Sequence, residues 1–118
     1  MIPKLAPFGL GRAMQLGFVV PNLDLALESW TQVLRIGPFL RLPGEQTVDA
    51  RFGGAPTAPR LRVAWAFSGT TQIALIEQLN DAPSPYVGRR GLEHLGFWVD
   101  DLEMAIGRIG NFLKSYRQ

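Results

Sequence analysis

The 118-residue chain contains no cysteine. This absence excludes disulfide bonds, thiolate metal ligands and cysteine nucleophiles. Histidine is nearly absent as well, because His94 is the only one in the sequence. Any site that needs an imidazole therefore depends on this single residue.

Long apolar runs and concentrated charge are also missing. No run approaches the roughly 20 apolar residues that span a bilayer, and the opening MIPKLAPFGLGRAM lacks an apolar segment of signal-peptide length. We therefore expect no membrane partner and a cytoplasmic location. The formal net charge is only +2 and the arginines are scattered along the chain. This distribution argues against a nucleic-acid partner, because a phosphate backbone requires concentrated positive charge.

Hydrophobic residues make up 47% of the chain, which is enough for the core of one domain. The β-prone residues 14–20 are followed by Pro21 and Asn22 and then by apolar residues at helical spacing over 23–34. This pattern predicts a strand and a helix, with Asn22 as the helix cap.

The middle of the chain predicts further strands. Residues 38–42 are expected to form a short strand, and the glycine- and proline-rich stretch 43–60 an excursion with one β-prone piece at 48–52. Alternating apolar residues over 61–68, a Gly-Thr turn and the β-prone stretch 71–78 predict a β-hairpin.

One segment of the sequence occurs twice. QLGFVVPNLDLAL, which begins at Gln15, recurs in register as HLGFWVDDLEMAI, which begins at His94. The second copy predicts a strand over 92–99 and a helix over 101–113. A strand-helix unit that recurs in so short a chain indicates a duplicated module, whose second copy lacks the three trailing strands of the first.

The repeated opening, the hairpin sequence VAWAFSGTTQIALIEQLNDAPSPY and the following GLEHLGFWVDDLEMAI together resemble the vicinal oxygen chelate superfamily. This superfamily includes glyoxalase I, methylmalonyl-CoA epimerase, extradiol dioxygenases and bleomycin-resistance proteins, and the likeness is greatest to the glyoxalase-like branch near the epimerases. The resemblance implies an α+β fold of paired βαβββ modules that enclose a cavity. It divides one domain, 1–118, into a first module at 12–79, a connecting loop at 80–91 and a partial second module at 92–118.

The resemblance also implies where a divalent metal such as Zn, Ni, Mn or Fe would bind. Its ligand positions fall on Gln15, His94 and Ala74, and the fourth would lie on a strand that this sequence does not contain. Alanine has no donor atom, glutamine is a weak neutral ligand, and one histidine alone does not hold a divalent ion against water. We therefore expect no metal cofactor unless a partner chain completes the site.

Side chains on the cavity face provide candidate ligand contacts. Gln15 and Gln72 share strand parity with the cavity and offer amide groups, and His94 offers a base or a hydrogen-bond donor. Glu77 is the only nearby acid with a claim to act as general base, although a regular strand turns it away from the face of Ala74.

Aromatic residues in the same region indicate a mostly apolar ligand. Trp98 shares the face of His94, and Trp65 and Phe67 share one face of their strand. Packing in the core under a helix is the commoner role for a pair such as Trp65 and Phe67. Tyr86, in the proline-rich loop, is expected at the cavity mouth.

These observations leave three functional hypotheses. The first is a glyoxalase-like module that binds a small apolar organic molecule without a complete metal site, as bleomycin-resistance proteins hold a ligand without transforming it. The second is a metal-dependent lyase or isomerase of glyoxalase or epimerase type whose site is completed across a dimer, and the third is an inactive truncated remnant. The missing strands leave an open sheet edge, which predicts a homodimer, with or without strand exchange.

Overall fold

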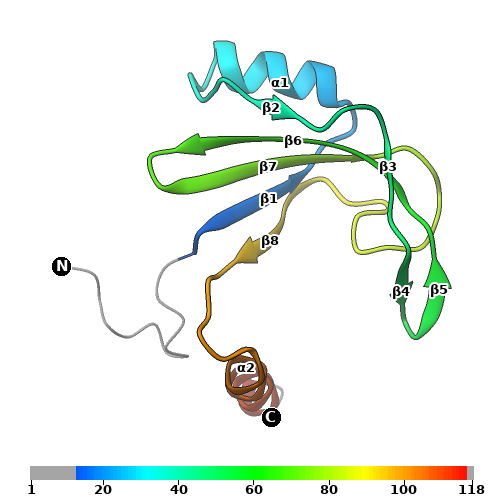
Figure 1. Cartoon of the computed structure of the whole chain (residues 1–118), viewed down its shortest axis with the longest axis vertical. Helices are drawn as coiled ribbons and strands as arrows, with labels where there is room; N and C mark the ends of the chain where they lie inside the picture. Colours follow the sequence, from blue (N-terminus) through cyan, green and yellow to red (C-terminus); the bar gives the residue numbers. More distant parts are fainter. Residues whose placement is uncertain (1–12, 117–118) are drawn as a thin grey trace.

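The computed structural model describes residues 13–116, and the side chains of residues 13–110. This part of the chain is an α+β structure in which one curved sheet carries a helix on one of its faces (Figure 1). In chain order the elements are β1 (Gln15–Val19), α1 (Leu23–Gln32), β2 (Leu40–Arg41), β3 (Gln46–Thr47), β4 (Ala50–Phe52), β5 (Ala55–Thr57), β6 (Arg60–Ser68), β7 (Thr71–Gln78), β8 (Gly91–Gly96) and α2 (Leu102–Tyr116).

The main sheet has the strand order β2, β6, β7, β1, β8, and β3 also pairs with β6. β1 is parallel to β7 and antiparallel to β8, so β1 and β8 join the two copies of the sequence repeat side by side. Leu16 lies directly opposite Leu95, its equivalent in the repeat. The first strands of the two copies, β1 and β8, are therefore related by a local two-fold axis. This arrangement confirms the predicted fold class.

α1 begins where the sequence places its cap. The Asn22 side chain accepts a hydrogen bond from the backbone N–H of Leu25 at 3.0 Å, as expected for an N-cap. The apolar side of α1 covers a core formed by Leu23, Ala64, Ile73 and Leu75, with Phe18 and Trp30 in edge-to-face contact beside it. Burial of this apolar stripe holds α1 on the sheet.

The predicted hairpin of β6 and β7 is present, but its large aromatic residues lie on the other face. Trp65 is paired with Ala74 and Phe67 with Gln72, whereas Ala64 and Ala66 from β6 are buried beneath α1. The interpretation of Trp65 and Phe67 as core residues under a helix is therefore wrong. Small residues occupy that position because α1 needs room to approach the sheet.

Two further expectations need correction. The excursion at 43–60 contains β3 and a separate two-stranded hairpin of β4 and β5. β8 ends at Gly96, earlier than the predicted strand end at residue 99, so Trp98 follows the strand and is not part of it.

α2 is capped by Asp101, whose carboxylate accepts a hydrogen bond from the backbone N–H of Met104 at 3.0 Å. In Figure 1 this helix lies beyond β8, at the opposite end of the strand order from β2. No Cα atom of this helix lies within 8 Å of a Cα atom in another described helix or strand, and Ile106 on its surface is 60% exposed. No helix in residues 13–116 is long and apolar enough to cross a bilayer.

Candidate functional site

The face of the sheet opposite α1 brings the candidate residues together. Gln15 on β1 is in register with Gln72 on β7, and Gly17 on β1 is in register with His94 on β8. Residues in register on neighbouring strands point to the same face. Gln15, Gln72 and His94 therefore share one surface, although they come from three different strands.

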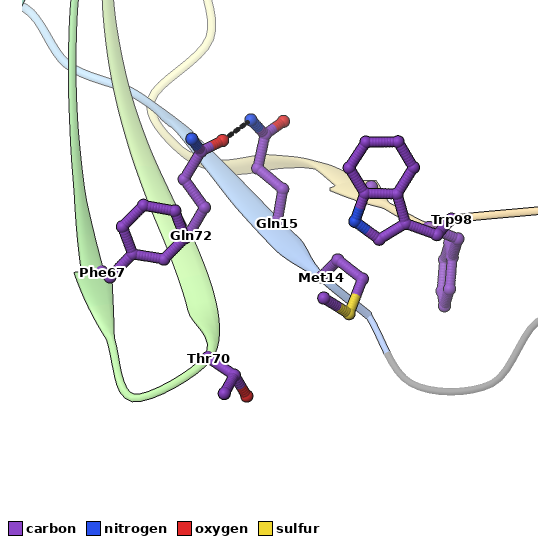
Figure 2. Close-up of a pocket in the computed structure, with 8 residues that line it drawn as sticks. Met14, Gln15, Phe67, Thr70, Gln72 and Trp98 are labelled. Atoms are coloured by element: carbon purple, nitrogen blue, oxygen red, sulfur yellow. Dashed lines mark hydrogen bonds between the residues drawn. The ribbon is translucent and has the colours of Figure 1, made fainter.

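A hydrogen-bonded chain links these three side chains. The Gln15 amide Nε2 donates to Oε1 of Gln72, as Figure 2 shows. The other end of the Gln15 amide, Oε1, lies 2.8 Å from Nε2 of His94. Because a carbonyl oxygen only accepts, His94 donates this hydrogen bond from Nε2.

Two glycines allow the strands to approach each other at this point. A Cβ on Gly17 would lie 2.1 Å from Cε1 of the His94 ring, and a Cβ on Gly96 would lie 3.0 Å from Cβ of Gln15. Gly17 and Gly96 are equivalent in the repeat. Each glycine thus makes room for the functional side chain of the other copy.

An irregularity in β8 sets the direction of His94. His94 opposes Gly17 but Leu92 opposes Phe18, so that Glu93 is an extra residue in this strand. Such a bulge interrupts the regular alternation of side chains along the strand and changes the face to which a side chain points. Glu93 remains close, with Oε2 3.7 Å from Nδ1 of His94.

A pocket of about 430 Å³ opens beside the hydrogen-bonded chain (Figure 2). Phe67 and Trp98 are exposed by 64% and 79%, and both border the pocket. Exposed aromatic rings around amide groups form a surface suited to a flat apolar molecule. The residues that line the pocket are Met14, Gln15, Phe67, Thr70, Gln72, Gly96, Phe97 and Trp98.

Three of the predicted ligand contacts, Gln15, Gln72 and Trp98, line this pocket. His94 contacts the pocket through Gln15 and is not itself part of the lining. Trp65 lies on the same face of the sheet but does not border the pocket.

Glu77 does not belong to this site. Its carboxylate accepts a hydrogen bond from the backbone N–H of Leu23 at 2.9 Å and lies 3.6 Å from the guanidinium of Arg62. Glu77 therefore stabilises the N-terminus of α1 on the other face of the sheet. The hypothesis that Glu77 acts as a catalytic base in the same cavity as His94 is wrong, because the strand parity of β7 separates the two.

Tyr86 lies next to another cavity, of about 260 Å³, that it shares with Phe52, Leu61 and other residues near the β4-β5 hairpin. Burial, together with the negative charge of Glu93, raises the pKa of the Tyr86 phenol above its ordinary value. The adjacent Ser84 is buried and accepts a hydrogen bond from the Tyr86 backbone N–H at 3.0 Å. The predicted place of Tyr86 at the mouth of the Gln15–Gln72 pocket is therefore wrong.

The residues at the expected metal positions do not fit a divalent cation. Ala74 is buried and has no donor atom, and the Gln15 oxygen and the His94 Nε2 are bonded to each other. Among the described residues there is no group of three His, Asp or Glu side chains that could hold a metal ion. The chemistry of the site rests on amides, one imidazole and aromatic rings.

Sequence reasoning missed the steric role of Gly17 and five lining residues, Met14, Phe67, Thr70, Gly96 and Phe97, of which Phe67 was interpreted as a core residue. A signal for the glycines is present in the sequence, because the repeat has glycine at the same position in both copies. No periodic pattern marks Thr70, which lies in the turn between β6 and β7.

Comparisons with known proteins agree with this architecture. A family model described as the Glyoxalase/Bleomycin resistance protein/Dioxygenase superfamily matches residues 14–112. The chain belongs to this superfamily. Among solved structures, the crystal structure of the hypothetical protein BH1468 from Bacillus halodurans C-125 is similar in fold, with 19% sequence identity and a TM-score of 0.57. The similarity covers 85% of this chain and 67% of that one. A comparison with curated proteins found none that matches.

Proposed function

We propose that this protein binds a small, largely apolar organic molecule in the pocket between Phe67 and Trp98, and that it does so without a metal ion. The observation that carries the proposal is the exposure of these two aromatic side chains on either side of the paired amides of Gln15 and Gln72. Aromatic rings that border a concave site gain stability when an apolar ligand covers them.

The polar groups of the pocket favour binding over catalysis. None of the described residues that line it carries a charge, so the lining provides no carboxylate or ammonium for proton transfer. Nε2 of His94 already donates a hydrogen bond to Oε1 of Gln15. The remaining side-chain polar groups of the lining are the amides of Gln15 and Gln72, the indole N–H of Trp98 and the hydroxyl of Thr70, and such groups orient a ligand through hydrogen bonds.

Acetophenone, a small aromatic ketone, provides a direct test. In an NMR titration of the full chain, we expect it to shift the Trp98 indole signal and the side-chain amide signals of Gln15 and Gln72. Trp98→Ala should weaken binding by about tenfold, the order of one aromatic contact. Trp30→Phe is the control and should leave binding unchanged, because Trp30 lies on α1 and packs against the core on the other face of the sheet.

Metal analysis of protein purified without chelator tests the second part of the proposal. We expect substoichiometric zinc, nickel, manganese and iron. A stoichiometric metal that is lost in His94→Ala would contradict the proposal and would support a metal-dependent lyase or isomerase of glyoxalase or epimerase type.

We also propose that two copies of the chain associate. In the described part of the chain, β8 has a strand neighbour on one side only, and α2 carries exposed apolar residues that no other described element covers. Both features lie at the same end of the strand order, so a second copy that adds to β8 would meet α2 as well.

A further inference from the structure

The Gln72 side chain has unused hydrogen-bonding capacity toward the pocket. Its Oε1 accepts from Gln15, but its Nε2 makes no hydrogen bond with the described residues. No buried side-chain nitrogen or oxygen of the described residues is without a partner, so Nε2 of Gln72 is open to the pocket or solvent. Figure 2 shows this nitrogen on the side of the amide away from Gln15.

The direction of the chain determines which atom Gln72 offers. A carboxamide has one accepting end and one donating end. If His94 donates to Oε1 of Gln15, then Nε2 of Gln15 donates to Oε1 of Gln72, and both N–H groups of Gln72 are left for a ligand. If His94 accepted, both amides would turn over and Gln72 would offer an oxygen in place of the N–H groups.

The surroundings of His94 favour the donating direction. The ring lies over Gly17, where no Cβ displaces it, and Glu93 Oε2 lies near Nδ1 at 3.7 Å while Gln15 Oε1 lies near Nε2 at 2.8 Å. The Glu93 oxygen lies beyond hydrogen-bond distance of Nδ1, whereas Oε1 of Gln15 lies within hydrogen-bond distance of Nε2, so the hydrogen bond places a ring proton on Nε2. No described lining residue is a carboxylate that would compete for the N–H groups of Gln72.

We propose that His94 is a positioning residue, which acts through Gln15 to present the Gln72 N–H groups to the pocket. The site then selects aromatic or other flat apolar molecules that carry a hydrogen-bond acceptor oxygen, such as a ketone carbonyl, over molecules of the same shape that carry a donor. This inference rests on the proposed binding function and names the ligand chemistry of the same pocket.

Three aromatic probes of similar size separate the effect of the ligand's hydrogen-bonding group from that of its apolar ring. Acetophenone carries an acceptor, aniline carries a donor, and ethylbenzene carries neither. Dissociation constants are measured on the full chain from NMR titrations that follow the Trp98 indole and the Gln72 side-chain amide. We expect acetophenone to bind about 3- to 10-fold more tightly than the other two, the effect of one net hydrogen bond.

Gln72→Glu tests whether the N–H groups of Gln72 are the donors that bind the ligand. The carboxylate still accepts from Gln15, but it replaces the N–H groups that face the pocket with a second oxygen. We expect the order of acetophenone and aniline to reverse in this variant. Gln32→Glu makes the same change at an exposed position of α1 and should leave the order unchanged.

His94 variants test the positioning role. His94→Ala removes the donor to Gln15 and should abolish the preference for acetophenone over aniline. His94→Gln provides a new N–H for Oε1 of Gln15 and should restore that preference. A residue that only fills space would change the affinities of all three probes together and would not be rescued by glutamine.

The possible results are distinguishable. If the three probes bind to wild-type protein with equal affinity, or if Gln72→Glu weakens the binding of all three equally, the positioning proposal is wrong. The proposed binding function is not contradicted by either result. If none of the probes shifts the Trp98 signal, both the binding function and this inference are overturned.

Discussion

The imidazole ring of His94 occupies the space where a side chain on Gly17 would lie, with its Cε1 atom 2.1 Å from the Cβ position of that residue. The two residues face each other across β1 and β8, which are the first strands of the two copies of the repeat. The absence of a side chain at Gly17 therefore provides the space that the His94 ring occupies.

Gly17→Ala should displace the His94 ring and break its hydrogen bond to Gln15. We expect a loss of about 1–3 kcal/mol in the free energy of unfolding, because the inserted methyl group overpacks the site. Urea unfolding measures the loss, and NMR of the His94 ring reports the displacement. Gly107→Ala is the control, since a Cβ at Gly107 meets nothing and should leave the His94 signals unchanged. Unchanged stability in Gly17→Ala would show that the ring moves aside at no cost.

Leu75→Ala should destabilise the fold by about 2–5 kcal/mol, because Leu75 is 0% exposed and its loss leaves a cavity beneath α1. Chemical unfolding followed by circular dichroism measures this change. Leu40→Ala removes an exposed leucine of β2 and should cost much less. Equal effects of the two variants would mean that α1 does not pack on this core.

The ion pair between Asp24 and Arg41, 2.8 Å apart, should make stability depend on acid pH. The hydrogen bond from Arg41 holds the pKa of Asp24 below its ordinary value of 3.8, and the charge of Arg62 adds to the effect. The stabilisation is therefore present above pH 3.8 and is lost as the pH falls through the lower pKa of the folded state. Unfolding curves of wild type and Asp24→Asn should differ at pH 6 and converge in strong acid. A gap that persists at the lowest pH would show that the effect does not depend on the charge of Asp24.

Association of two copies should depend on the apolar surface of α2. We expect wild-type protein to sediment as a dimer at micromolar concentration and Ile106→Glu to sediment as a monomer, because a charge cannot be buried there without a partner. Leu25→Glu is the matched control, since Leu25 lies on α1 and is 63% exposed, much like Ile106. A well-folded wild-type monomer at that concentration would refute the proposed homodimer.

Local patterns were sufficient to predict much of the fold. The alternation over 61–68, the Asn22 cap and the repeat depend on residues close in sequence, and the corresponding elements are found near the expected positions. The predicted helix that follows the second copy of the repeat is also present as α2, and Asp101 caps it. Boundaries that depend on strand pairing, such as the end of β8 at Gly96, were less well predicted.

The orientation of β6 shows why part of the site was mispredicted. The large apolar residues of this strand, which include Trp65 and Phe67, share one face, and the alternation predicts that face as the core. The face is decided by α1, which packs closely only over the small side chains of Ala64 and Ala66. That choice depends on a helix far away in sequence and on the register of three strands. The extra residue Glu93 is likewise visible only in the pairing of β8 with β1.

The two-fold relation between β1 and β8 has a consequence for the polarity of the pocket. Two identical residues at positions 15 and 94 would present the same group from either side of the axis. Glutamine on one side and histidine on the other make the pair unequal, although Leu16 and Leu95 next to them lie directly opposite each other. This difference, together with Gln72 on the β1 side and the extra residue Glu93 in β8, makes the two ends of the pocket unequal, and a ligand in the pocket would be bound in one orientation.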